Sequence, residues 1–149
     1  MASKFFTSDQ KQQIVSAIKD AELNTSGEIR VHIENHCKKE ALDRAATVFA
    51  SLKMHKTKLR NGVLFYLSVK DHKFAILGDG GVNAVVPDDF WDNIKEMMQH
   101  KFKEGEFTAG LTSGIKMAGE QLKAHFPYQS DDINELSDDI SFGDNKANE

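Results

Sequence analysis

The fold of this chain is most constrained by residues 63–69, which read Val-Leu-Phe-Tyr-Leu-Ser-Val. A short run that is almost free of polar residues and rich in branched and aromatic side chains predicts a central strand buried on both faces. A strand of this kind requires helices on both sides of its sheet. The chain is therefore expected to form an α/β fold, and its 149 residues suffice for one domain with a single sizeable core.

Two more strands are predicted beside the central one. Residues 28–35 alternate polar and apolar side chains, which indicates a half-buried strand. Its inward-facing residues are Ile29, Val31 and Ile33. Helical spacing over 39–55 predicts a right-handed crossover that makes 28–35 parallel to 62–69. After a tight turn, the segment 73–78 is expected to add an antiparallel hairpin strand.

Three further helices are predicted. The first begins at Thr7 or at the residue after it, because Thr7 and Gln10 have capping-box spacing. The second begins at Pro87, since proline and acidic residues suit a first turn, and it ends at Gly105. The last spans 107–125, with apolar side chains at helical spacing. Together with the crossover helix they cover both faces of the sheet. The predicted architecture is a three-layer α/β/α sandwich on a small mixed sheet with one parallel strand pair.

Charge divides the chain into a domain, residues 1–128, and an acidic tail, residues 129–149. The tail holds seven acidic residues and one lysine, a formal charge of −6, which leaves +2 for the rest of the chain. Its apolar residues follow neither helical nor strand periodicity, so a mostly extended segment is expected. The apolar residues through which it would dock on the domain are Ile133, Leu136, Ile140 and Phe142.

Composition excludes several classes of protein. The formal net charge of −4 argues against nucleic-acid binding. No run of about 18 apolar residues exists, so direct membrane insertion is not expected, and the N-terminus lacks the apolar core of a signal peptide. The single cysteine, Cys37, excludes an internal disulfide and a cysteine-rich zinc site. A soluble protein of the reducing cytoplasm is expected, and the sequence leaves the identity of any protein partner open.

The predicted topology brings three loops to one edge of the sheet. Both parallel strands begin there and the antiparallel strand ends there, so residues 25–28, 60–62 and 78–81 should converge beside the next helix. The carboxylates at this edge are those of Asp79, Asp88 and Asp89. Carboxylate, amide, hydroxyl and backbone oxygens are the ligands that calcium and magnesium prefer, which indicates a divalent-cation site. The alternative is that these carboxylates serve only as a turn residue and as helix caps.

Five segments of the chain follow one another in a distinctive order. They are 25–31 (Thr-Ser-Gly-Glu-Ile-Arg-Val), 61–67 (Asn-Gly-Val-Leu-Phe-Tyr-Leu), 73–83 (Lys-Phe-Ala-Ile-Leu-Gly-Asp-Gly-Gly-Val-Asn), 86–88 (Val-Pro-Asp) and 102–111 (Phe-Lys-Glu-Gly-Glu-Phe-Thr-Ala-Gly-Leu). In this combination the chain resembles the TPM-domain family, named for a thylakoid phosphatase, a photosystem repair protein and a worm receptor modulator. The resemblance, over roughly residues 6–126, implies an α/β/α sandwich and a divalent-cation site in the loops at this edge. It implies acid phosphatase activity for some members only.

The chain departs from the common family pattern at three points. Arg60 stands where many members have an aspartate before Asn-Gly. Asn83 replaces an acidic residue, while Asp79 supplies a new carboxylate. The signal peptide and membrane anchor that are frequent in the family are not found in the sequence. Since fewer carboxylates weaken the binding of a hard cation, little or no phosphatase activity is expected.

Other reactive residue types are assigned structural roles. The six histidines show no helix-face ligand spacing and are interpreted as solvated or hydrogen-bonded side chains. Cys37 follows His36, but adjacent side chains point apart, and no serine, cysteine or histidine forms an evident nucleophile–base pair. The basic residues between 53 and 60 are interpreted as favouring a helix C-terminus, with attraction of phosphate as the alternative.

Three functions are compatible with these observations. The leading hypothesis is a soluble TPM-domain protein that binds calcium or magnesium at the sheet edge. Its expected ligands are Asp79, Asp88 and Asp89, supported by Asn61 and Asn83. The second hypothesis is a metal-dependent acid phosphatase in which Lys58 or Arg60 steers the substrate. The third is a protein-interaction module with a purely structural ion.

Overall fold

A small mixed sheet forms the centre of the protein. The computed structural model describes residues 4–87, 89–128 and 137–143. Its strands are β1 (Glu28–Glu34), β2 (Gly62–Ser68), β3 (Lys73–Gly78) and β4 (Ser141–Phe142), in the spatial order β3-β2-β1-β4. β1 runs parallel to β2 and to β4, and β3 is antiparallel to β2. The predicted parallel pair and hairpin strand are confirmed, and β4 is an addition from the acidic tail.

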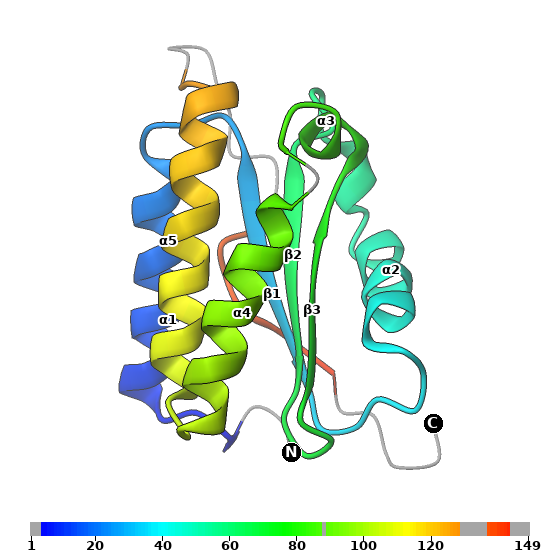
Figure 1. Ribbon diagram of the computed structural model, residues 1–149, viewed down its shortest axis with the longest axis vertical. Coiled ribbons are helices and arrows are strands. Elements are labelled where there is room, and N and C mark those ends of the chain that lie inside the picture. The colour runs from blue at the N-terminus through cyan, green and yellow to red at the C-terminus, as the bar shows by residue number, and fades with distance from the viewer. Residues whose placement is uncertain (1–3, 88, 129–136, 144–149) are drawn as a thin grey trace.

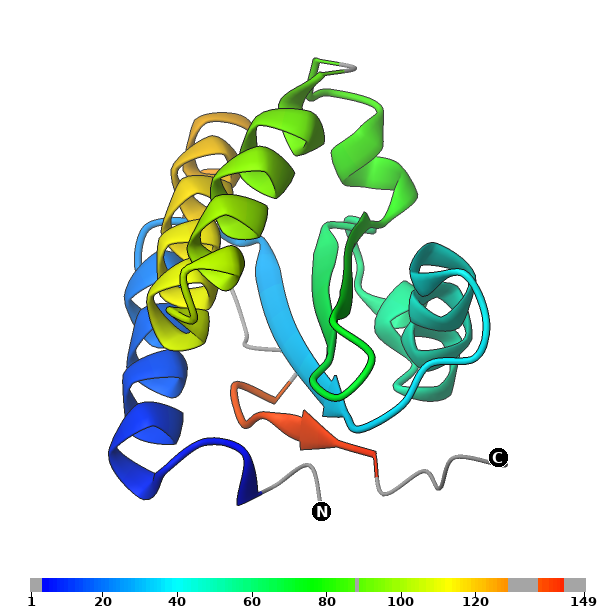
Figure 2. The same ribbon diagram turned by 60° about the horizontal axis from the view of Figure 1, so that its bottom comes forward.

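Helices cover both faces of this sheet, as the buried central strand requires (Figures 1 and 2). One face carries α1 (Ser8–Glu22), α4 (Phe90–Lys103) and α5 (Phe107–His125). The other face carries α2 (Ala41–Ser51). A short helix, α3 (Gly80–Asn83), follows β3 at one end of the sheet. The three-layer α/β/α sandwich is therefore confirmed.

All seven residues of β2 are buried, and they divide between two cores. Phe65 and Leu67 face the larger core under α1, α4 and α5, whereas Leu64 and Tyr66 face the smaller core under α2. The alternation follows from the period of two along a strand. The continuous apolar run at 63–69 thus reflects burial on both faces, as predicted.

The polar face of β1 differs from the prediction. The apolar residues of the strand, such as Val31, face the larger core, but the opposite face is buried as well. Glu28 is 3% exposed, His32 7% and Glu34 0%. The description of β1 as half-buried is therefore wrong. Polar–apolar alternation indicates two different environments, and here both are buried except at Arg30, which is partly exposed.

Several boundaries also differ. The crossover helix predicted over 39–55 ends at Ser51, because Lys53 has a left-handed backbone (φ 58°) and a 3₁₀ turn spans Met54–Lys56. The basic residues that follow begin at Lys53, directly after the C-cap Leu52, so they lie just beyond the last turn of α2. The helix predicted from Pro87 begins at Phe90. The capping box of α1 is confirmed by the reciprocal bonds between Thr7 and Gln10.

Part of the acidic tail packs on the domain. Ile140 and Phe142 lie against the larger core, as predicted. Ile133 and Leu136 fall outside the described residues. In the part of the chain that the structure describes, every helix is too short or too polar to cross a membrane.

Candidate functional site

The three loops that were predicted to converge meet where β1 and β2 begin. Glu28 and Gly62 are paired at the start of the two parallel strands. The Glu28 amide donates to the Asn61 carbonyl (3.3 Å), and the Asp79 amide donates to the Gly62 carbonyl (2.9 Å). These bonds tie the end of β3 to the start of β2 and β1, beside α3 at the top of Figure 1. We call the loops at residues 25–28, 60–62 and 78–81 the loop edge.

Asp79 holds the centre of the loop edge through an ion pair with Arg60. The Arg60 Nε and Nη2 atoms each donate to one carboxylate oxygen of Asp79 at 2.7 Å. The same carboxylate accepts from the Gly80 amide (2.8 Å) and caps α3. Burial raises the pKa of Asp79, but the hydrogen bonds from Arg60 and Gly80, with the charges of Arg60 and His55, outweigh it and leave the pKa below its ordinary value. The carboxylate is therefore anionic at neutral pH.

Burial distinguishes the two partners of this ion pair. The Asp79 side chain is 5% exposed, whereas the Arg60 side chain is 56% exposed. Arg60 also has a left-handed backbone (φ 53°), which turns the loop toward α3. Because an exposed arginine is well solvated, its removal from the pair would cost little, whereas the buried carboxylate would need a replacement cation.

Close backbone packing holds the two sides of the loop edge together. The Gly81 amide donates to the Arg60 carbonyl (2.9 Å). A Cβ atom at Gly81 would lie 2.2 Å from the Leu59 carbonyl oxygen, so only glycine fits there. Asn61 is 2% exposed, and its Nδ2 atom donates to the Ser26 hydroxyl (3.4 Å). Amide and hydroxyl oxygens therefore lie in the loops around the Asp79 carboxylate.

The remaining predicted ligands have other roles or lie apart. The Asn83 side chain donates through Nδ2 to the Gly78 carbonyl (2.8 Å) and accepts from Trp91 Nε1 (3.0 Å), so it links β3 to α4. Asp89 is exposed at the N-cap position of α4 and makes no side-chain capping bond. Asp88 lies outside the described residues. The structure thus brings Asn61 and Asp79 together at the loop edge and gives Asn83 a structural role.

The described residues fit a divalent cation only in part. Among them, no three histidine, cysteine, aspartate or glutamate side chains are grouped as they would be around a metal ion. The carboxylates of the loop edge are those of Asp79 and of the buried Glu28, and the amide of Asn61 and the hydroxyl of Ser26 accompany them. An ion with so few charged ligands would bind weakly and would have to displace the Arg60 guanidinium.

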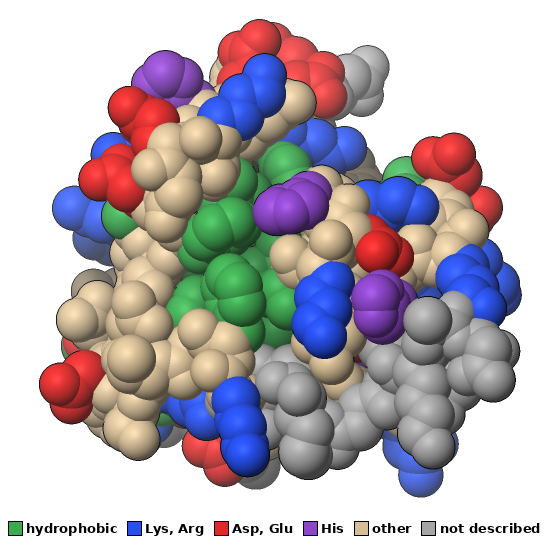
Figure 3. All heavy atoms as spheres, turned by 90° about the horizontal axis from the view of Figure 1, so that it is seen from below, with side chains coloured by type: hydrophobic (Ala, Val, Ile, Leu, Met, Phe, Trp, Pro, Cys, Tyr) green, Lys and Arg blue, Asp and Glu red, His purple; other side chains and the backbone are tan. Residues whose placement is uncertain are grey.

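The opposite end of the molecule is apolar and aromatic. Phe5 packs edge-on against Phe107 (5.2 Å between centroids), Phe107 stacks on Phe102 (5.3 Å), and Phe102 packs against Phe74 (5.0 Å). Phe5 is 41% exposed. Seen from that end, hydrophobic side chains gather in the middle of the surface (Figure 3).

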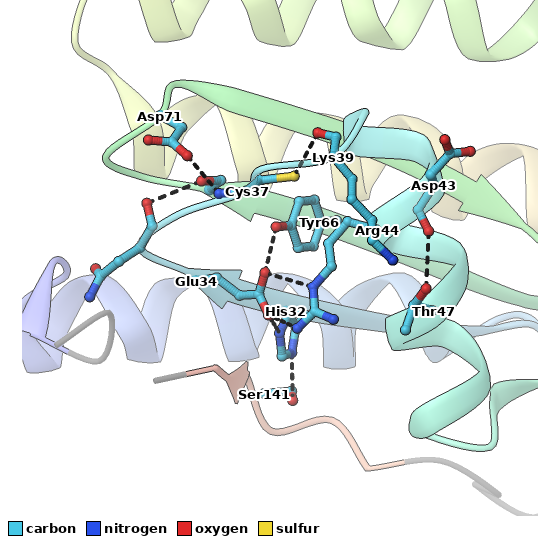
Figure 4. A network of polar contacts seen from close by, with 12 residues as sticks. His32, Glu34, Cys37, Lys39, Asp43, Arg44, Thr47, Tyr66, Asp71 and Ser141 are labelled. Carbon is cyan, nitrogen blue, oxygen red and sulfur yellow. Dashed lines mark hydrogen bonds and ion pairs between the residues drawn. The ribbon is translucent and has the colours of Figure 1, made fainter. Parts of the chain in front are cut away.

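A second polar centre lies under α2, around Glu34 at the end of β1 (Figure 4). Glu34 is fully buried, yet it accepts from Arg44 Nε (3.1 Å) and Nη2, from the Tyr66 hydroxyl (2.5 Å) and from His32 Nε2 (3.1 Å). Burial raises the pKa of Glu34, but the hydrogen bonds from His32, Arg44 and Tyr66 prevail and lower it to about 2. Burial and the neighbouring Glu34 raise the pKa of Tyr66, so the phenol remains a donor.

These bonds orient His32 toward the tail. Since Glu34 is an ionised acceptor, the Nε2 atom of His32 donates to it, and the Nδ1 atom lies 2.8 Å from the Ser141 hydroxyl oxygen. Ser141, His32 and Glu34 form a chain of hydrogen bonds, but the two ring nitrogens are interchanged relative to a serine–histidine–acid triad, in which the serine contacts Nε2. The sequence did not indicate this contact between a serine and a histidine. The partners are 109 residues apart, and only the polar alternation in β1 hinted at the arrangement.

Cys37 has the structural role that the sequence indicated. It is a free, buried thiol that donates to the Lys39 carbonyl (3.2 Å). Its backbone amide donates to the Asp71 carboxylate (2.6 Å), which also contacts His36 Nδ1 (3.2 Å). These bonds join the loop after β1 to the β2–β3 turn, so Asp71 and Cys37 stabilise the fold at that end.

A protein-family comparison matches most of the chain. The family model described as the TPM domain matches residues 2–121. The chain belongs to the TPM-domain family. The TPM domain includes the loop edge, all of β1 and the residues that contact the tail, whereas β4 lies beyond the match. No curated protein sequence matches the chain.

Solved structures agree with this assignment. The BA42 protein of the psychrophilic bacterium Bizionia argentinensis is 50% identical, with a TM-score of 0.89, and the alignment covers 96% of this chain and 99% of BA42. The N-terminal domain of a P. gingivalis protein is 16% identical (TM-score 0.68; 85% and 84% covered). The N-terminal domain of the cg2496 protein of Corynebacterium glutamicum is 12% identical (TM-score 0.63; 78% and 74% covered). The last two share the fold alone with this TPM-domain protein.

Proposed function

We propose that this TPM-domain protein binds a divalent cation, calcium or magnesium, at the loop edge, with little or no catalytic activity. The observation that supports this most is the buried, anionic Asp79, whose counter-charge comes from the mostly exposed side chain of Arg60. A divalent cation and a guanidinium compete for the same two oxygens. The proposed ligands are Asp79, Asp88 and Asp89, with Asn61 and Asn83 in support, as predicted from the sequence.

The proposal makes the affinity depend on Arg60 in a specific direction. If the cation replaces the guanidinium, Arg60→Gln removes a competitor and should tighten binding. With few carboxylates available, the dissociation constant is expected on the order of 10⁻⁴–10⁻³ M. A tenfold excess of the ion over that constant would raise the free energy of unfolding by about 1.4 kcal/mol.

The experiment is a titration with calcium chloride or magnesium chloride at constant ionic strength, followed by residue-resolved NMR and by the melting temperature. Shifts should be confined to residues 25–28, 60–62 and 78–89. The double variant Asp79→Asn with Asp88→Asn should lose most of the ion-dependent rise in melting temperature, because Asn keeps the size but not the charge. Asp92→Asn, an exposed position in the first turn of α4, is the matched control.

Two results would contradict this proposal. If the double variant keeps the full ion-dependent rise, the ligands lie elsewhere. If the shifts are spread along the acidic tail, the ion binds only as a weak counterion.

A metal-dependent acid phosphatase is the alternative function. A bound ion would polarise a phosphoryl oxygen or lower the pKa of a water, while Lys58 or Arg60 would attract the substrate. We expect little or no hydrolysis of an aryl phosphate from pH 5 to 8 with calcium, magnesium, manganese or no metal. Saturable turnover that disappears in Asp79→Asn would establish the phosphatase instead.

The proposal also includes location and partners. The single, free Cys37 suits a reducing compartment, so we place the protein in the cytoplasm. No nucleic-acid partner is proposed. If the ion is purely structural, the protein is an interaction module, and the exposed aromatic end in Figure 3 supports that third function.

A further inference from the structure

The segment Ser137–Gly143, which we call the docked segment, lies along the outer edge of β1 (Figure 2). Ser141 pairs with His32 and Phe142 with Ile33 in a parallel ladder. The Gly143 amide donates to the Ile33 carbonyl (2.9 Å). The docked segment therefore satisfies backbone groups that an edge strand would otherwise leave open to another chain.

Three consecutive positions of the docked segment meet different environments on β1. The Ser141 hydroxyl bonds to His32 (Figure 4). The Phe142 side chain packs against the larger core, with Lys11 Nζ 5.4 Å from the centre of its ring. A Cβ atom at Gly143 would lie 2.7 Å from Glu34 Oε1. The outer edge of β1 therefore accommodates a hydroxyl residue, an aromatic residue and a glycine at three successive positions.

The attachment of the docked segment is short and carries an acid–acid contact. Only two residues form the strand β4. The Asp138 and Glu22 carboxyl groups lie close enough to interact, and the Glu22 carboxyl also lies near the charge of Glu28. Two partly buried carboxyl groups this close favour a state in which one of them is protonated. Asp139 lies near Arg30, which provides an opposite charge.

We propose that the outer edge of β1 is a binding site for an extended segment of another protein, in which an acidic stretch precedes a hydroxyl residue, an aromatic residue and glycine. The docked segment occupies this site within the same chain and competes with that partner. Such recognition is β-strand addition, in which main-chain bonds provide affinity and side-chain pockets provide specificity. The site lies wholly within the TPM domain, whereas its present occupant lies beyond residue 121.

Charge supports an acidic residue at one position of the partner. Arg30 lies near Asp139 of the docked segment and Lys11 lies over the Phe142 ring, whereas Arg44 is already paired with Glu34. The contacts of Ser141 and Phe142 with His32 and Ile33 involve none of the proposed cation ligands, so the proposal does not depend on cation binding.

Because Asp138 lies close to Glu22, binding of the docked segment to the outer edge of β1 should depend on pH. Burial, then the bond to Asp138 and the charges of Asp138 and Glu28, raise the pKa of Glu22 to about 9, although the Ile29 amide opposes them. The part of this shift that comes from Asp138 favours the bound segment when Glu22 is protonated, so binding should weaken as the pH rises toward about 9.

The test uses the full-length protein and a fluorescent peptide, Ser-Asp-Asp-Ile-Ser-Phe-Gly, identical to residues 137–143. In the protein variant Gly143→Val, the added side chain should collide with Glu34 and release the docked segment, while every residue of β1 keeps its identity. Fluorescence anisotropy should show at least tenfold tighter peptide binding to this variant than to the wild type. A second releasing variant, Phe142→Asp, should behave alike, and both should keep the wild-type NMR shifts of α4 and α5.

Matched peptides decide whether the site is specific. A peptide with valine in place of its glycine should bind at least tenfold more weakly, and one with alanine in place of its second serine should also lose affinity. Binding should weaken from pH 6 to pH 8, and Glu22→Gln should remove that dependence, because glutamine donates to Asp138 without titrating.

Three outcomes would overturn the proposal. One is no peptide binding to either releasing variant, and another is equal binding of the glycine and valine peptides. The third is a dimer formed by exchange of the docked segment between two copies that the peptide cannot dissociate.

Discussion

The charge of Glu34 should contribute about 3 kcal/mol to the free energy of unfolding. Glu34→Gln preserves the shape of the side chain but removes the anion that accepts from Arg44, Tyr66 and His32. The glutamine amide would also point its N–H groups at side chains that are themselves donors, those of Arg44, Tyr66 and His32. Removal of one partner from a buried ion pair typically costs about 3–5 kcal/mol. The Arg44 side chain is 31% exposed, so solvent screens its charge and the lower value applies.

The pKa of Glu34 gives the same value for its contribution to the free energy of unfolding. Its ordinary pKa of 4.5 falls to about 2 in the folded protein, a difference equivalent to about 3 kcal/mol. Because the folded pKa is the lower one, this stabilisation is present above pH 4.5 and is lost as the pH falls toward 2. Wild-type stability should therefore decrease over that range by about 3 kcal/mol more than the stability of Glu34→Gln.

The assay is urea unfolding of both proteins at pH 7 and at intervals down to pH 2, with thermal unfolding in parallel. At pH 7 the variant should melt about 6–12 °C lower, given about 2–4 °C per kcal/mol for a domain of this size. Glu104→Gln is the matched control, since Glu104 pairs with His100 on an exposed helix face. A loss below 1 kcal/mol for Glu34→Gln, or the same acid dependence in both proteins, would refute the reasoning.

Two further predictions concern packing. Leu64→Ala and Phe65→Ala should each lower the free energy of unfolding by about 2–5 kcal/mol, because each truncation leaves a cavity in a different core. Urea unfolding measures this loss. A cost near zero for either variant would show that helices do not cover that face of the sheet. Gly81→Ala should lower the free energy of unfolding by about 1–3 kcal/mol and shift the NMR signals of Arg60 and Asp79, because the new Cβ atom would lie 2.2 Å from a backbone oxygen. Unchanged signals would mean that the loops are not in close contact.

The arrangement of the strands could be predicted from the sequence because it depends on periodicity and chain direction. Residues 63–69 indicated burial on both faces, and the helix between two strands required a parallel pair. Convergence of the three loops then followed from topology alone. The pairing of Glu28 with Gly62 places those loops as expected.

The contacts within the site could not be predicted in the same way. The Arg60–Asp79 pair depends on a left-handed backbone at Arg60, which a non-glycine residue rarely adopts and which no local pattern signals. The bond between His32 and Ser141 joins residues 109 positions apart. The two-residue strand that carries Ser141 is too short to show a period.

The unequal size of the two cores determines how the molecule should open. Three helices share the larger core, whereas α2 is held by the smaller one, through residues such as Val48 and Phe49. Local unfolding free energies follow the apolar area that each unit buries. The amides of α2 should therefore exchange with deuterium before those of α1 and α5. Such an opening would carry Arg44 away from Glu34, so the first cooperative unit to unfold would also leave a buried carboxylate without its guanidinium.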